Sequence, residues 1–127
     1  MLASSFRALD VWQRSMVLVE ECYRTTRSFP DDERFGLTSQ IRRAAVSIPS
    51  NVAEGRCRKS TATYANHVDI ALGSHGELET LIEVACRLGY LTKTAGEPLI
   101  SSCQAVGQML TRLHQSLELK IRTNPRR

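Results

Sequence analysis

The sequence predicts an all-α fold, an antiparallel up-down-up-down bundle of four helices. Apolar residues recur at the helical period through four long segments, and short segments with Pro, Gly or polar residues separate them. No segment alternates apolar and polar residues convincingly enough to predict a strand. A chain of 127 residues can form one domain with its own core. We therefore expect a single domain over 1–127, with a basic, flexible tail from about residue 120.

The first two predicted helices cover about residues 8–27 and 33–55. The apolar residues of the first are Leu9, Trp12, Met16, Val19, Tyr23 and Thr26. Pro30 ends this pattern, and acidic residues 31–33 suit the positive N-terminal end of the second helix. The apolar stripe of the second is Leu37, Ile41, Ala44, Ala45, Ile48 and Val52. Pro49 predicts a kink between about Ala45 and Pro49, and Gly55 suits the C′ position.

The third predicted helix starts at Ser60 or Thr61, either of which can cap it, and ends at Gly89. Its apolar stripe is Tyr64, Val68, Ala71, His75, Leu78, Ile82, Ala85 and Leu88. Gly73 and Gly76 each cost about 1 kcal/mol in a helix relative to Ala, which predicts a close neighbour to at least one of them.

The fourth predicted helix follows the segment LTKTAGEP, and Pro98 suits its first turn. Its apolar residues repeat by four and three, as in a heptad seam. They are Leu99, Cys103, Val106, Leu110, Leu113 and Leu117.

The composition favours a protein of the cytoplasm. No run of 18 apolar residues predicts a membrane helix, and the first residues lack the pattern of a secretory signal. The four cysteines are scattered and form no CxxC pair, which predicts free thiols and no zinc site. The net charge of +4 permits an anionic partner without requiring one.

No constellation of residues predicts an enzyme. The patterns GxGxxG, GxSxG, HExxH and GxxxxGK followed by Ser or Thr are all absent. Di-iron bundles use Glu-x-x-His pairs, but Tyr64, Leu72 and Thr111 stand three residues before the histidines. We therefore expect no catalytic residue, no metal ligand and no cofactor, and we interpret His67 and His75 as polar edge or core residues.

The second predicted helix carries a polar face opposite its apolar stripe. Its residues are Ser39, Arg43, Ser47, Ser50 and Glu54. Small hydroxyl side chains let another helix come close, and an Arg and a Glu can pair across such a contact. This pattern favours a contact between copies of the chain over a solvated surface, which stays the alternative.

Basic residues are concentrated between Arg34 and Lys59, where six bases accompany one acid. The candidate nucleic-acid-binding residues are Arg42, Arg43, Arg56, Arg58 and Lys59. Further bases, in the predicted tail, are Lys120, Arg122, Arg126 and Arg127. We expect Arg56, Arg58 and Lys59 to lie together at one end of the bundle. Few aromatic residues stand among these bases, so contact with phosphates is favoured over base stacking.

Several segments resemble one known family over about residues 6–117. They read FRALDVWQRS, SFPDDERFGLTSQIRRAAVSIPSNVAEG, ALGSHGELETLIEVACRLGYL and MLTRLHQSL. The family is that of the four-helix-bundle proteins encoded in intervening sequences of bacterial 23S ribosomal RNA genes. Accessory variability proteins of diversity-generating retroelements are related to it. The resemblance implies a four-helix bundle and a ring of five copies, and it brings no catalytic residues.

The retroelement relatives bind nucleic acid and a reverse transcriptase, which leaves two functional hypotheses. The first is a non-enzymatic homo-oligomer, a pentamer by resemblance, that binds RNA or DNA through basic surfaces. The alternative is a protein-binding adaptor or scaffold for a partner such as a reverse transcriptase. Phosphate binding weakens steeply with salt, whereas apolar docking depends on salt only slightly.

Overall fold

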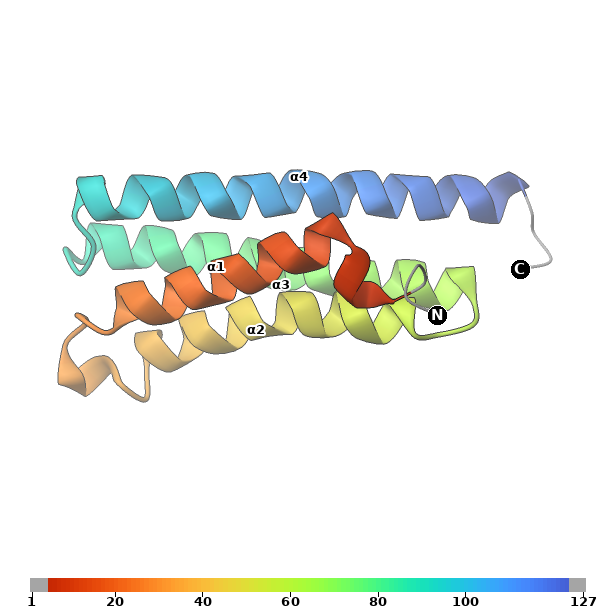
Figure 1. Cartoon of the computed structure of the whole chain (residues 1–127). Coiled ribbons are helices and arrows are strands. Elements are labelled where there is room, and N and C mark those ends of the chain that lie inside the picture. Colours follow the sequence, from red (N-terminus) through yellow and green to blue (C-terminus); the bar gives the residue numbers. More distant parts are fainter. Residues whose placement is uncertain (1–4, 124–127) are drawn as a thin grey trace.

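The structure is a computed structural model that describes residues 5–123. These residues form four long helices, two short 3-10 helices and no strand, which confirms the predicted all-α bundle. The elements are η2 (Phe6–Ala8), α1 (Asp10–Thr26), η3 (Asp31–Glu33), α2 (Leu37–Arg56), α3 (Thr61–Arg87) and α4 (Lys93–Thr123). The long helices lie side by side, and short connections join the neighbouring ends of successive helices (Figure 1).

The buried face of α1 differs from the predicted one. Its buried residues are Val11, Ser15, Leu18, Cys22 and Thr26. Of the predicted stripe, only Thr26 is buried, while Met16 and Tyr23 are exposed and the rest half-buried. The polar residue Ser15 disguised the true stripe, but its hydroxyl donates to the Val11 carbonyl at 2.6 Å and is therefore satisfied inside the core.

Because α1 buries a different face from the predicted one, an apolar groove lies between α1 and α2. Trp12, Met16 and Val19 of α1 line it, opposite Val46 and Pro49 of α2. Met16 is 38% exposed and Val46 is 40% exposed. The predicted core stripe of α1 thus forms a partly exposed apolar surface beside α2.

Glu33 links the start of α2 to the connection between α3 and α4. Its Oε1 accepts a hydrogen bond from the Leu37 amide at 3.1 Å, and its Oε2 accepts one from the Tyr90 hydroxyl at 2.8 Å. The bond from the Leu37 amide, followed by that from Tyr90, lowers the pKa of the Glu33 carboxyl below its usual value. Glu33 therefore accepts from the first amide of α2, although the N-cap is Gly36, and the acidic residues precede a helix that begins at Leu37 and not at residue 33.

All six predicted apolar residues of α2 are buried. Pro49 is also buried, and α2 is helical on both sides of it. The kink at Pro49 stays a prediction.

Gly55 lies inside α2 and not at its C′ position, because the helix continues to Arg56. A Cβ atom on Gly55 would stand 2.7 Å from the His67 Cβ and 3.0 Å from the Tyr64 Cδ1. The absence of a side chain therefore lets the C-terminal end of α2 lie directly against α3. The close packing of α2 on α3 therefore requires glycine at this position.

The start and end of α3 agree with the sequence pattern. Ser60 is the N-cap, and its Oγ accepts a hydrogen bond from the Thr63 amide at 3.2 Å. Gly89 follows the helix with a φ of 79°, a conformation that favours glycine. Leu88, however, is 55% exposed and does not belong to the core stripe.

The prediction that another group of the chain lies close to Gly73 or Gly76 was wrong. A Cβ atom at either position would have no neighbour within 4 Å. Both glycines are exposed on the outer side of α3. Two glycines of α4 do accommodate a neighbour: a Cβ on Gly107 would stand 2.6 Å from the His75 Nε2, and one on Gly96 would stand 3.1 Å from the Cys86 Sγ.

Helix α4 is longer at both ends than the sequence predicted. It begins at Lys93, so Pro98 lies beyond its first turn. The side chain of Thr92 accepts a hydrogen bond from the Ala95 amide at 3.2 Å, which starts the helix early. At the other end residues 120–123 are helical, not a tail, because Ile121 packs against the core. Residues 124–127 lie outside the described part.

The close approach at Gly55 generates a stability prediction. Gly55→Ala should lower the free energy of unfolding by about 1–3 kcal/mol, because the methyl group forces α2 away from α3. Gly76→Ala, the matched control, should raise it by about 0.5–1 kcal/mol, because the new methyl meets no atom and alanine favours the helix. Urea unfolding at one fixed protein concentration measures both. Equal effects of the two substitutions would contradict the close packing.

Candidate nucleic-acid interface

Four basic side chains surround one hollow at an end of the bundle. Arg56 ends α2, and Arg58 and Lys59 follow in the connection to α3. Lys120, from the last turns of α4, lines the same hollow of about 390 Å³. Arg56 is half-buried and the other three are exposed. The structure therefore brings together the three bases of the connection and adds a fourth from 61 positions along the chain.

The other walls of the hollow are hydroxyl-bearing and apolar. Ser60, Thr61 and Tyr64 come from the first turn of α3 and its N-cap. Ser116, with Leu113 and Leu117, comes from α4, and Leu9 completes the lining. Burial raises the pKa of the Tyr64 hydroxyl, while the nearby Arg56 acts in the opposite direction.

Sequence reasoning missed Tyr64 and Ser116 as site residues and placed Lys120 in a tail. A signal for Tyr64 was present, because it lies one helical turn after the N-cap Ser60 and so shares its side of α3, next to the connection that carries the bases. No comparable signal identified Lys120 or Ser116, since the side of α4 that faces this connection depends on how the helices pack.

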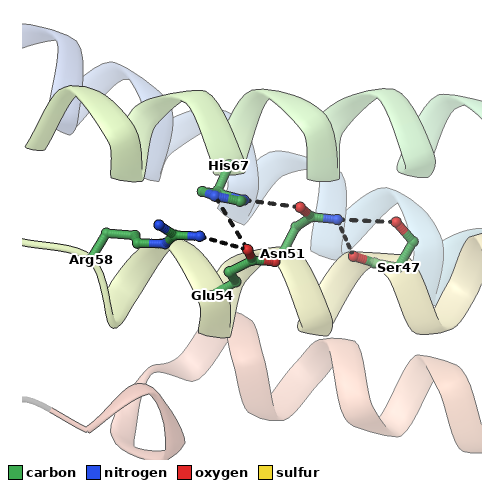
Figure 2. A network of polar contacts seen from close by, with 5 residues as sticks. All are labelled: Ser47, Asn51, Glu54, Arg58 and His67. Atoms are coloured by element: carbon green, nitrogen blue, oxygen red, sulfur yellow. Dashed lines mark hydrogen bonds and ion pairs between the residues drawn. The ribbon is translucent and has the colours of Figure 1, made fainter. Parts of the chain in front are cut away.

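A polar network joins α2 to α3 beside the hollow (Figure 2). Glu54 Oε2 accepts a bond from Arg58 Nη2 at 3.0 Å and lies 3.8 Å from His67 Nε2. His67 Nδ1 contacts Asn51 Oδ1 at 3.1 Å, and Asn51 Nδ2 donates to the carbonyl and hydroxyl oxygens of Ser47. This network fixes the side of α2 that faces α3.

The ion pair between Arg58 and Glu54 is exposed and therefore weak. The two side chains are 52% and 53% exposed and stand one helical turn apart. Pairs of this kind contribute about 0.3–0.5 kcal/mol and lose strength with salt. Breaking this pair so that Arg58 can contact a phosphate would therefore cost little free energy.

The five residues of the predicted oligomer-contact face of α2 lie in different environments. Ser47 faces α3, where its hydroxyl lies 2.7 Å from the Ser74 hydroxyl, and Glu54 belongs to the network of Figure 2. Arg43 is exposed beside Ser47, in a hollow that Glu77 also lines. Ser39 is half-buried. Ser50 is exposed and lies on the apolar groove between α1 and α2.

Arg42 lies outside the hollow and holds α1 to α2. Its Nε donates to the Thr26 hydroxyl at 2.9 Å, and its Nη2 donates to the Tyr23 carbonyl at 3.4 Å. The guanidinium also lies 4.5 Å from the centroid of the Tyr23 ring. These contacts tie Arg42 to the C-terminal end of α1. The adjacent Arg43 is exposed and makes no contribution to the hollow.

The four cysteines are free, and they differ in surroundings. Burial raises the pKa of Cys22 and of Cys103 to about 12. Burial also raises the pKa of Cys86, which is half-buried near the end of α3. Cys57 is exposed between Arg56 and Arg58. Its thiol therefore lies at the basic end of the bundle.

The structure places two histidines in contacts within the bundle. His67 belongs to the network of Figure 2, and His75 Nε2 lies 2.7 Å from the Cys103 carbonyl oxygen. Over residues 5–123, no group of three His, Cys, Asp or Glu side chains could hold a metal ion. None of the helices described over that range is both long and apolar enough to cross a membrane.

Comparison with known proteins agrees with this architecture. The family model described as 23S rRNA-intervening sequence protein matches residues 7–112. A solved structure from Bacteroides thetaiotaomicron, described as a protein with unknown function from the S23 ribosomal protein family, is similar in fold with a TM-score of 0.74. The two are 23% identical, over 82% of this chain and 97% of that chain. No curated protein matches this chain.

Proposed function

We propose that this chain, which belongs to the 23S rRNA-intervening sequence protein family, is a homo-oligomer that binds nucleic acid through its basic end. The observation that carries the proposal is the convergence of Arg56, Arg58, Lys59 and Lys120 on one hollow. Cations gathered at one place on the surface attract the phosphates of RNA or DNA. The proposal places the protein in the cytoplasm, as the sequence predicts.

The local charge supports phosphate binding better than the modest net charge of +4 does. The four bases around the hollow come from two segments, and the nearby acid Glu54 is engaged by Arg58 and His67. In a symmetric assembly the same cluster would recur once in each copy, which multiplies the attraction for one long polyanion.

We propose that the protein is not an enzyme, because two of its histidines and two of its thiols serve the fold. His67 and His75 contact groups of the bundle, and the buried thiols of Cys22 and Cys103 stay protonated at neutral pH because their pKa is raised to about 12. The ring of His75 contacts the backbone carbonyl of Cys103, and no hydrogen bond joins it to the thiol that it would have to activate.

Self-association is proposed through the apolar groove between α1 and α2. Trp12, Met16 and Val46 line this groove, and they are half-buried or exposed in the single chain. A second copy that covers them would remove apolar surface from water. Ser50 lies at the same groove, which keeps part of the predicted contact face of α2 in this role. Five copies are proposed, as the family resemblance implies.

Reversal of three charges tests the nucleic-acid proposal. Arg56, Arg58 and Lys59 changed together to Glu should weaken binding about equally for unrelated sequences. The slope of log affinity against log salt should fall in magnitude by about 2 for single strands, because each phosphate contact contributes about 0.7. Fluorescence anisotropy with labelled RNA and duplex DNA at several salt concentrations measures both quantities.

The matched control reverses Arg24, Arg27 and Arg34, which are exposed at the opposite end of the bundle. This variant has the same net charge as the first and should retain most of the affinity. Equal losses in the two variants would show that only the overall charge matters. No binding by the parent protein near physiological salt would refute the proposal, and the protein-adaptor hypothesis would then lead.

Substitution at the groove tests self-association. Ser50→Arg should shift the protein to smaller species without loss of helicity, because a long charged side chain enters the proposed contact. Ser47→Arg does not isolate the contact between copies, because it also breaks the hydrogen bond of Ser47 to Ser74 within the chain. Ser101→Arg, at an exposed position of α4, is the control. Light scattering and circular dichroism measure size and helicity. A parent-like mass for Ser50→Arg would contradict this contact.

A further inference from the structure

We propose that the hollow at the basic end holds one unpaired nucleotide of a bound strand, with its phosphate against the bases of the connection between α2 and α3. This inference rests on the proposed function and makes it more specific. It concerns RNA and DNA alike, because a phosphate, a sugar and an unstacked base are common to both.

The size of the hollow suits a nucleotide. Its volume of about 390 Å³ lies in the range of about 300–1,000 Å³ that is usual for pockets of small organic ligands. A single phosphate would leave most of this space empty. A base that is still paired in a duplex cannot enter it, whereas an unpaired base can turn out of its strand.

The walls of the hollow differ in chemistry in the same way as the parts of a nucleotide do. Arg56, Arg58 and Lys59 supply positive charge for the phosphate. The hydroxyls of Ser60 and Ser116 can donate to or accept from a sugar or a base edge.

Tyr64 gives the base an aromatic neighbour. Its ring packs against Gly55, since a Cβ there would stand 3.0 Å from the Tyr64 Cδ1. The ring is therefore held in place by α2 while it lines the hollow. Aromatic side chains stack with unpaired bases of any sequence. Base stacking, which the sequence did not favour, becomes possible because the fold brings Tyr64 to the cations.

An experiment that fills the hollow without a change of charge tests the inference. Ser116 is exposed in α4, so Ser116→Met should fold normally and extend an unbranched side chain into the space. Ser101→Met, at an exposed position of α4 outside the hollow, is the matched control. The probes are a short single-stranded RNA, a DNA of the same sequence and a blunt duplex of equal length, each followed by fluorescence anisotropy.

We expect Ser116→Met to bind the single strands about tenfold more weakly and the duplex within about twofold of the parent protein. A loss for RNA only, for DNA only or for both supports the site and identifies the sugar that it accepts. Equal affinities of parent and variant for single strands, or equal losses for strand and duplex, would overturn the inference while the proposed function stands. No binding of any probe by the parent would overturn both.

Discussion

The contact between α2 and α3 at Gly55 is the constraint on which the proposed site depends. Because no side chain separates the helices there, His67 and Tyr64 lie directly against the C-terminal end of α2. The chain can then turn from Arg56 to Thr61 within a few residues. This short turn holds Arg58 and Lys59 beside the first turn of α3, where Tyr64 faces the hollow. A larger residue at position 55 would move the bases and the aromatic ring apart.

The polar contacts along the same helix pair define how α2 and α3 align. Apolar side chains pack in more than one register with similar energy, but hydrogen bonds between specific partners select one arrangement. Ser47 contacts Ser74 and Asn51 contacts His67, so two separate points along α2 are fixed against α3 (Figure 2 shows the second). The polar residues that suggested a subunit contact therefore serve partly to align helices of one chain.

The sequence predicts the helices well where one stripe is clearly apolar. The buried residues of α2 and the N-cap Ser60 follow from periodicity and capping. The buried residues of α1 did not follow from periodicity. Two neighbouring stripes of this helix have similar polarity, and the buried Ser15 satisfies its hydroxyl within its own helix. The hollow was only partly predictable. Arg56, Arg58 and Lys59 lie within four consecutive positions of the chain, whereas the contribution of Lys120 requires the packed position of α4.

Protection of Cys57 from a thiol reagent tests most directly whether nucleic acid binds at this end of the bundle. Cys57 is exposed and stands between Arg56 and Arg58 in the chain, whereas Cys86 is half-buried near the far end of α3 and provides an internal reference. Maleimide labelling at neutral pH, read by peptide mass, would be followed with and without excess single-stranded RNA. If nucleic acid binds at this end of the bundle, labelling of Cys57 alone becomes slower, and high salt reverses the effect. An unchanged rate at Cys57 under conditions where RNA is bound would contradict binding at this end.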